Sequence, residues 1–223
     1  MPPRVHVLAR SPLTPAAVAE FLALPTERPV DDDVEAVDAE LTRRGWDWEH
    51  ELVCDSFRTG HGHVVCSDGR NPFGRADVRS FLVFGELYPF DEHDEDMTNE
   101  PWLRAHMDLW SRVPGWERDK ACTYQDCETT LAQAARAVTE HLGAGPERSL
   151  LSDAAVVTGP AMTHRVWRTP THAVVLGPAA DNGPYGYLTH LQLSLTPLTC
   201  APELPPAADE NALDAWITAH VDW

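Results

Sequence analysis

Two stretches of the chain carry apolar residues at helical spacing. Within residues 126–143 the apolar positions recur every three or four residues, at Leu131, Ala134, Ala135, Val138 and Leu142. Residues 31–45 repeat the pattern after an acidic start, with apolar positions at Val34, Val37 and Leu41. Asp126 is placed to cap the start of the later helix, and Gly143 and Gly45 to end the two helices. We therefore expect two amphipathic helices.

Each expected helix is followed by segments with β-strand character. They are residues 46–57, 61–66 and 78–88 after the first helix, and residues 163–168, 171–177 and 185–195 after the second. The order of one helix and then three strands therefore occurs twice, and the sequence AVDAEL at 36–41 resembles AVTEHL at 137–142. The pattern predicts an α+β fold of two halves, each a helix on an antiparallel sheet, for which an internal duplication is one explanation.

The hydrophobic pattern distinguishes two of the expected strands. In residues 185–195, leucines at 191, 193 and 195 share one side, whereas His190, Gln192 and Ser194 share the other. This alternation predicts a sheet with one face on a core and one face in water. Residues 80–87 are apolar on both sides, which predicts a central strand that is covered on both faces.

An acidic and tryptophan-rich segment separates the two halves. We expect an N-terminal α/β half at residues 1–90, a connector at residues 91–125 and a C-terminal α/β half at residues 126–223. The connector should hold a short helix over residues 101–112, capped by Thr98 or Asn99, with Pro101 in its first turn. A proline-rich linker then leads to a C-terminal helix that docks on the body of the protein through Leu213, Trp216, Ile217 and His220.

Composition favours a folded protein with a protein partner. The 223 residues are 43% hydrophobic and 23% charged, which is ordinary for a globular chain. The formal net charge of −18 repels phosphate backbones and anionic lipids, so we expect neither nucleic acid nor membrane as a partner. A basic protein would instead be attracted over a long range. The simpler interpretation is that the charge serves solubility alone.

Several features indicate a cytoplasmic bacterial protein. Five cysteines, an odd number at irregular spacings, argue against a disulfide framework. Pro12, Pro15 and Glu20 interrupt the apolar N-terminal stretch, and no segment has about 20 uninterrupted apolar residues. Lys120 is the only lysine, whereas arginine, alanine and proline are abundant. This bias is typical of a GC-rich genome such as that of an actinobacterium.

Cys54, His61, His63 and Cys66 are the strongest candidates for metal ligands. On a strand, however, the two histidines would share one face and Cys66 would lie on the other, so the four groups would not converge. Their spacings match no common zinc pattern. We therefore expect no metal and no cofactor, although the two histidines could hold a metal if a third ligand came from elsewhere.

The sequence contains no local catalytic signature. It lacks a Gly-x-Ser-x-Gly elbow, a phosphate-binding glycine loop, a dinucleotide fingerprint and a His-Glu-x-x-His motif. Active sites are also assembled from distant residues, so a small enzyme remains an alternative. In that case His61 and His63, with His190 and Gln192 of the polar sheet face, would line the pocket.

The connector carries the best candidate for a partner-binding site. Its acidic residues are Asp91, Glu92, Asp94, Glu95 and Asp96. Trp102 and Trp110 follow closely, and aromatic anchors beside negative charge suit a binding face for a basic protein. The run lacks the glycine and the spaced glutamate of a calcium loop. A solvated loop next to core tryptophans is the structural alternative.

A small acidic α+β protein with these features resembles the immunity proteins that protect bacteria from toxins. The resemblance is of composition and architecture, and no diagnostic motif carries it. It implies a non-catalytic inhibitor that binds a basic toxin or effector. A small enzyme and a structural component of a larger assembly are the alternatives.

Overall fold

The computed structural model describes residues 4–53, 55–69, 71–89, 101–153, 155–156, 160–180, 188–201 and 203–221. The strands are β1 (Val5–Arg10), β2 (Asp47–Glu49), β3 (Ser56–Arg58), β4 (Val64–Ser67), β5 (Ser80–Pro89), β6 (Glu117–Asp119), β7 (Arg148–Ser152), β8 (Met162–Arg168), β9 (His172–Ala180) and β10 (Thr189–Pro197). The helices are α1 (Pro15–Leu22), the 3-10 turn η1 (Leu24–Thr26), α2 (Val34–Arg44), α4 (Pro101–Trp110), α5 (Tyr124–Leu142) and α6 (Glu210–Val221). The predicted α+β class and C-terminal helix are confirmed.

The ten described strands belong to one antiparallel sheet, in which eight follow the order β2-β3-β4-β5-β10-β9-β8-β7 and β1 and β6 lie off this path. The long strand β5 pairs with β10 along one side. Along its other side it pairs first with β4 and then with β1, which also pairs with β6. The two predicted halves therefore share a single sheet and meet where β5 lies beside β10. Strands from residues 1–90, 91–125 and 126–223 all contribute to it.

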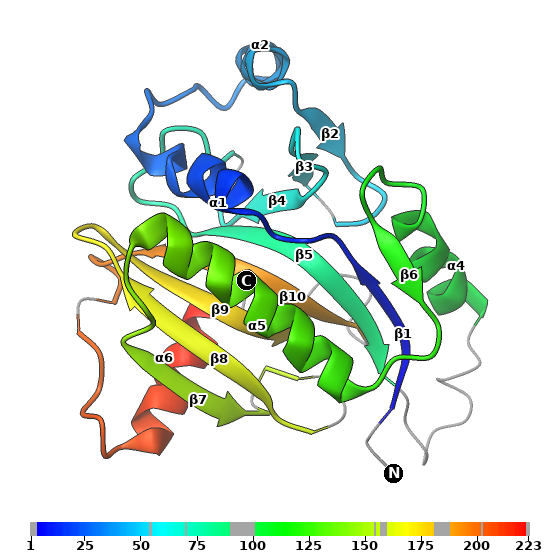
Figure 1. Ribbon diagram of the computed structural model, residues 1–223. Coiled ribbons are helices and arrows are strands. Elements are labelled where there is room, and N and C mark those ends of the chain that lie inside the picture. The colour runs from blue at the N-terminus through cyan, green and yellow to red at the C-terminus, as the bar shows by residue number, and fades with distance from the viewer. Residues whose placement is uncertain are drawn as a thin grey trace.

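Helices cover both faces of this sheet (Figure 1). On one face α5 packs on β8 and β9 and contacts α1, above a core that includes Leu82, Phe84 and Leu193. On the opposite face α6 packs on β7, β9 and β10, while α4 lies beside β1. The prediction that residues 80–87 form a central strand covered on both faces is confirmed.

The prediction that the polar face of β10 lies in water is wrong. His190, Gln192 and Ser194 are at most 1% exposed. Helix α6 packs on this strand, and the Gln192 side-chain amide donates to the Val221 carbonyl oxygen at 2.8 Å and to the Ser194 hydroxyl at 3.0 Å. His190 lies instead beside the buried Glu86 carboxylate of β5. A period-two pattern shows which side chains share a face, but it does not show which distant element packs on that face.

The two predicted helices form close to their expected ends. Helix α2 starts after Asp33, whose carboxylate accepts from the Ala36 N–H, and ends at Gly45 in the left-handed conformation. Helix α5 starts at Tyr124 rather than at Asp126, because Thr123 and Asp126 form a reciprocal capping box. Asp126 is therefore the third helical residue and not the N-cap.

Gly177 on β9 gives a prediction about stability. The imidazole of His164, on the neighbouring strand β8, lies over this glycine, and an added Cβ atom would lie 2.2 Å from His164 Cδ2. We expect Gly177→Ala to lower the free energy of unfolding by about 2 kcal/mol, because the fully buried imidazole must leave its place. Urea denaturation measures the effect. Gly145→Ala, whose Cβ atom would meet nothing within 4 Å, is the control; equal effects in the two variants would contradict the prediction.

Candidate functional site

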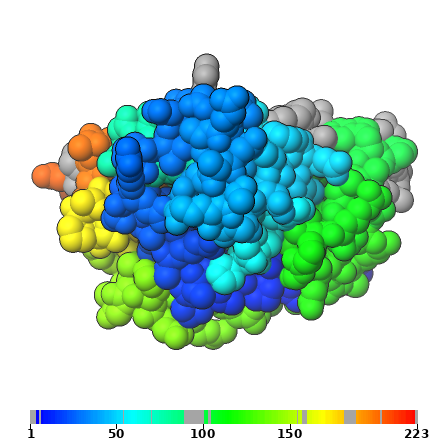
Figure 2. All heavy atoms as spheres, turned by 90° about the horizontal axis from the view of Figure 1, so that it is seen from above, coloured from blue at the N-terminus to red at the C-terminus, as the bar shows by residue number. Residues whose placement is uncertain are grey.

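Residues 31–38, at the start of α2, form an acidic segment. Five of its eight residues are acidic, none is basic, and all five are exposed: Asp31, Asp32, Asp33, Glu35 and Asp38. Figure 2 looks onto the molecule from the side of α2, and the blue atoms of this part of the chain fill the middle of that face. We call residues 31–38 the α2 acidic segment. A surface of this kind attracts cationic groups.

A groove of about 700 Å³ lies beside the α2 acidic segment. The described residues that line it are Asp32, Val34, Val37, Trp48, Asp55, Asp68, Gly69 and Arg75. Three carboxylates and one guanidinium therefore face a space that also has apolar walls. Val34 is 65% exposed there, although its spacing had placed it on the apolar face of the predicted helix. Among the described residues, the α2 acidic segment is the densest run of negative charge, and this groove lies beside it.

Hydrogen bonds hold the groove's polar groups in place. The Asn71 side-chain amide donates to the Asp32 carboxylate at 2.6 Å, and the Trp48 indole N–H donates to the Asp38 carboxylate at 2.5 Å. The Arg79 guanidinium pairs with Asp68 at 2.5 Å. Arg75 makes one longer contact of 3.5 Å with Asp32. The Asp32 and Asp68 carboxylates, which line the groove, are thus held in place by neighbouring side chains.

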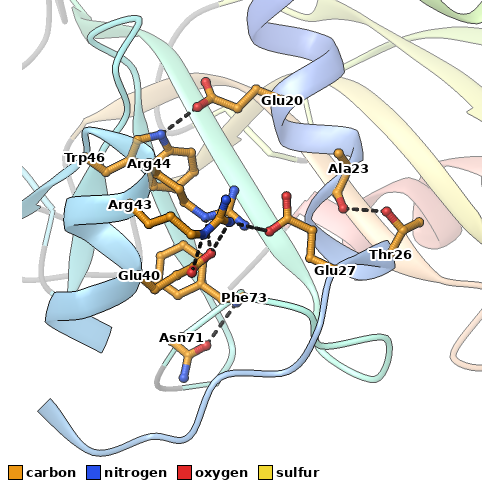
Figure 3. A network of polar contacts seen from close by, with 10 residues as sticks. All are labelled: Glu20, Ala23, Thr26, Glu27, Glu40, Arg43, Arg44, Trp46, Asn71 and Phe73. Carbon is orange, nitrogen blue, oxygen red and sulfur yellow. Dashed lines mark hydrogen bonds and ion pairs between the residues drawn. The ribbon is translucent and has the colours of Figure 1, made fainter. Parts of the chain in front are cut away.

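The polar network in Figure 3 fixes α2 to the body of the protein. The Arg44 side chain is only 5% exposed and pairs with Glu27 and Glu40. Its guanidinium lies over the Trp46 and Phe73 rings, 5.3 and 4.9 Å from their centroids. Burial lowers the pKa of Arg44, although the charge of a nearby glutamate partly offsets this effect. The network anchors the C-terminal end of α2 and thereby supports the helix that forms one wall of the groove.

The three predicted metal-ligand candidates with described positions, His61, His63 and Cys66, do not form a common metal site. Cys54 lies outside the described residues. The half-exposed His61 faces Glu20 at 3.7 Å, whereas His63 is buried with its Nε2 atom 3.2 Å from the Pro12 carbonyl oxygen. Burial lowers the pKa of His63 to about 4. Cys66 is buried against Phe81. Among the residues with described positions, no group of three or more His, Cys, Asp or Glu side chains is arranged to hold a metal ion.

The structure shows one charged cluster that the sequence reasoning missed. Glu86, on β5, is fully buried, and its two carboxylate oxygens lie 3.0 Å from His106 Nε2 and 3.2 Å from His190 Nε2. Burial raises the pKa of Glu86, but the hydrogen bonds and charges of the two histidines outweigh it and lower the pKa to about 2. Glu86 is the only charged residue of β5. The sequence did carry one signal for this cluster, because a single carboxylate in a strand predicted to be covered on both faces needs a buried partner.

Of the predicted partner-binding residues, the structure describes Trp102 and Trp110, and these two differ in exposure. The acidic run from Asp91 to Asp96 lies outside the described residues. Trp102, in the first turn of α4, is 40% exposed and accessible to a partner. Trp110 is 0% exposed and its ring lies 4.0 Å from that of Trp116. The proposal that Trp110 contacts a partner is therefore corrected: this side chain is a core residue that packs α4 against the sheet.

Comparison of the chain with protein-family models, with curated proteins and with solved structures found no match. In the part of the chain that the structure describes, none of the helices has the length and apolar character needed to cross a membrane.

Proposed function

We propose that this protein is a binding module for a basic partner protein, and that it acts as an immunity-type inhibitor of a toxin or effector. The observation that carries the proposal is the α2 acidic segment, which has five exposed carboxylates and no basic residue and lies next to a groove. Trp102 and the acidic run at residues 91–96 remain a predicted second contact region.

The physical basis is electrostatic steering. A net charge of −18 raises the encounter rate with a basic protein, and the effect weakens as salt screens it. Toxins that cleave nucleic acids need basic surfaces for their substrate. An acidic protein that covers such a surface competes directly with the substrate, and it needs no catalytic residues to do so.

Co-expression with basic proteins encoded beside its gene tests this function. We expect one such protein to arrest bacterial growth when it is expressed alone, and growth to return when this chain is present. The association rate of the purified pair should fall roughly ten-fold between low and physiological salt. A pair that associates at the same rate at both salt concentrations, or a set of neighbours that neither bind nor cause arrest, would contradict the proposal.

A further inference from the structure

We propose that the groove beside α2 binds the guanidinium group of an arginine side chain presented by the basic partner. This inference rests on the proposed function and names the chemistry of one of its contacts. It commits the groove to a single kind of occupant, an arginine-bearing loop of a protein. The argument depends on the charge of the lining, on its aromatic wall and on a guanidinium that the chain itself places there.

The charge of the lining matches a cation. Asp32, Asp55 and Asp68 approach the groove from three separate parts of the chain: the start of α2, the β2–β3 connection and the end of β4. Arg79 already pairs with Asp68. Asp32 and Asp55 are both exposed, so they are the two carboxylates that an incoming cation would meet. A positive charge in the groove is attracted to both carboxylates.

Arg75 shows that a guanidinium fits this groove. Its Nη1 atom lies 3.5 Å from an Asp32 oxygen, and its Nε atom lies 3.5 Å from an Asp77 oxygen. Contacts of this length between partly exposed groups are weak, because solvent screens them. A partner arginine that approaches Asp32 more closely can therefore replace or join Arg75 at little energetic cost.

The aromatic wall favours arginine over lysine. Trp48 is half-buried, and its indole is held by the hydrogen bond to Asp38, by packing on Phe57 with ring centroids 4.9 Å apart, and by the stacked His50 ring at 5.4 Å, so a guanidinium would stack on the part of the indole that these rings leave open. A planar guanidinium can stack on an indole and still donate to carboxylates at its edge. An ammonium group is a compact, strongly hydrated charge that gains less from such a wall.

Binding of two labelled peptides, hexa-arginine and hexa-lysine, provides the test. Fluorescence anisotropy would measure their affinities for the wild type and for three variants: Asp32→Asn with Asp55→Asn, Asp55→Asn alone, and Trp48→Leu. Glu117→Gln with Glu140→Gln is the matched control, because it removes two exposed charges that do not line the groove. Thermal unfolding of each variant would verify that it is folded.

We expect hexa-arginine to bind the wild type at least five-fold more tightly than hexa-lysine. The double groove variant should weaken hexa-arginine binding ten-fold or more, Asp55→Asn alone should weaken it by a smaller factor, and the control should change it less than three-fold. Trp48→Leu should remove the preference for arginine. Equal losses in the groove and control pairs, or equal affinity for the two peptides, would overturn the inference and indicate diffuse attraction only.

The outcome separates this inference from the proposed function. If the groove variants still neutralise a toxic partner while the peptide preference is absent, the protein is an inhibitor that uses another contact. If the peptide preference is present but no basic partner is bound or neutralised, the groove binds arginine and the inhibitor function is wrong.

Discussion

Replacing Glu86 by alanine is expected to lower the free energy of unfolding by about 3–5 kcal/mol. The carboxylate is fully buried and holds two imidazoles, His106 on α4 and His190 on β10. Removing one partner of a buried ionic contact leaves the other groups without compensation in a region of low polarity. Urea denaturation at pH 7 measures the loss. Glu117→Ala, which removes an exposed carboxylate, is the control and should change stability by less than about 0.5 kcal/mol.

The same residue predicts a pH dependence. The pKa of Glu86 is lowered from 4.5 to about 2 in the folded protein, so its contribution is fully present above pH 4.5 and is lost as the pH falls towards 2. A pKa shift of this size corresponds to about 3 kcal/mol of the free energy of unfolding. Wild type should therefore lose more stability than Glu86→Gln between pH 6 and pH 3. Parallel pH profiles for the two proteins would show that Glu86 does not titrate in this way.

The second large effect is expected for Trp110→Ala, at about 3–5 kcal/mol of lost stability. The indole is fully buried against Trp116 and Met107, and removing it leaves a large cavity under α4. Trp102→Ala, on the same helix, is the control, because its side chain is 40% exposed and should cost less than about 1 kcal/mol. Thermal or urea unfolding compares them. A Trp110 variant that unfolds like the Trp102 variant would show that the indole is not part of the core.

Local features of the fold were predictable from the sequence. The helical spacing in residues 31–45 and 126–143 corresponds to α2 and α5, and the doubly apolar segment at 80–87 corresponds to the central strand β5. Strand neighbours were not predictable, because pairing depends on contacts between distant segments. Nothing in residues 80–87 indicates that residues 189–195 lie beside them. The burial of His190 and Gln192 was missed for the same reason.

The site was harder to predict than the fold. The acidic residues at 31–38 were interpreted only as a helix start, which is correct for Asp33 and Glu35 but does not account for Asp31, Asp32 and Asp38. The groove collects side chains from positions 32, 48, 55, 68 and 75, and it exists only after β2, β3 and β4 have paired. Sequence patterns reveal charge density well, but they do not reveal which loops enclose a cavity.

The pairing of β5 with β10 has a consequence for how the protein is made. On the ribosome, residues 80–89 emerge long before their neighbours at 189–197. Strand β5 is apolar on both faces and lacks one hydrogen-bonded partner during that interval. The nascent chain therefore exposes an aggregation-prone edge until residues 189–197 have been translated, and slow, non-local pairing of this kind favours engagement by chaperones. Synthesis of residues 189–197, rather than of the first core, completes the sheet.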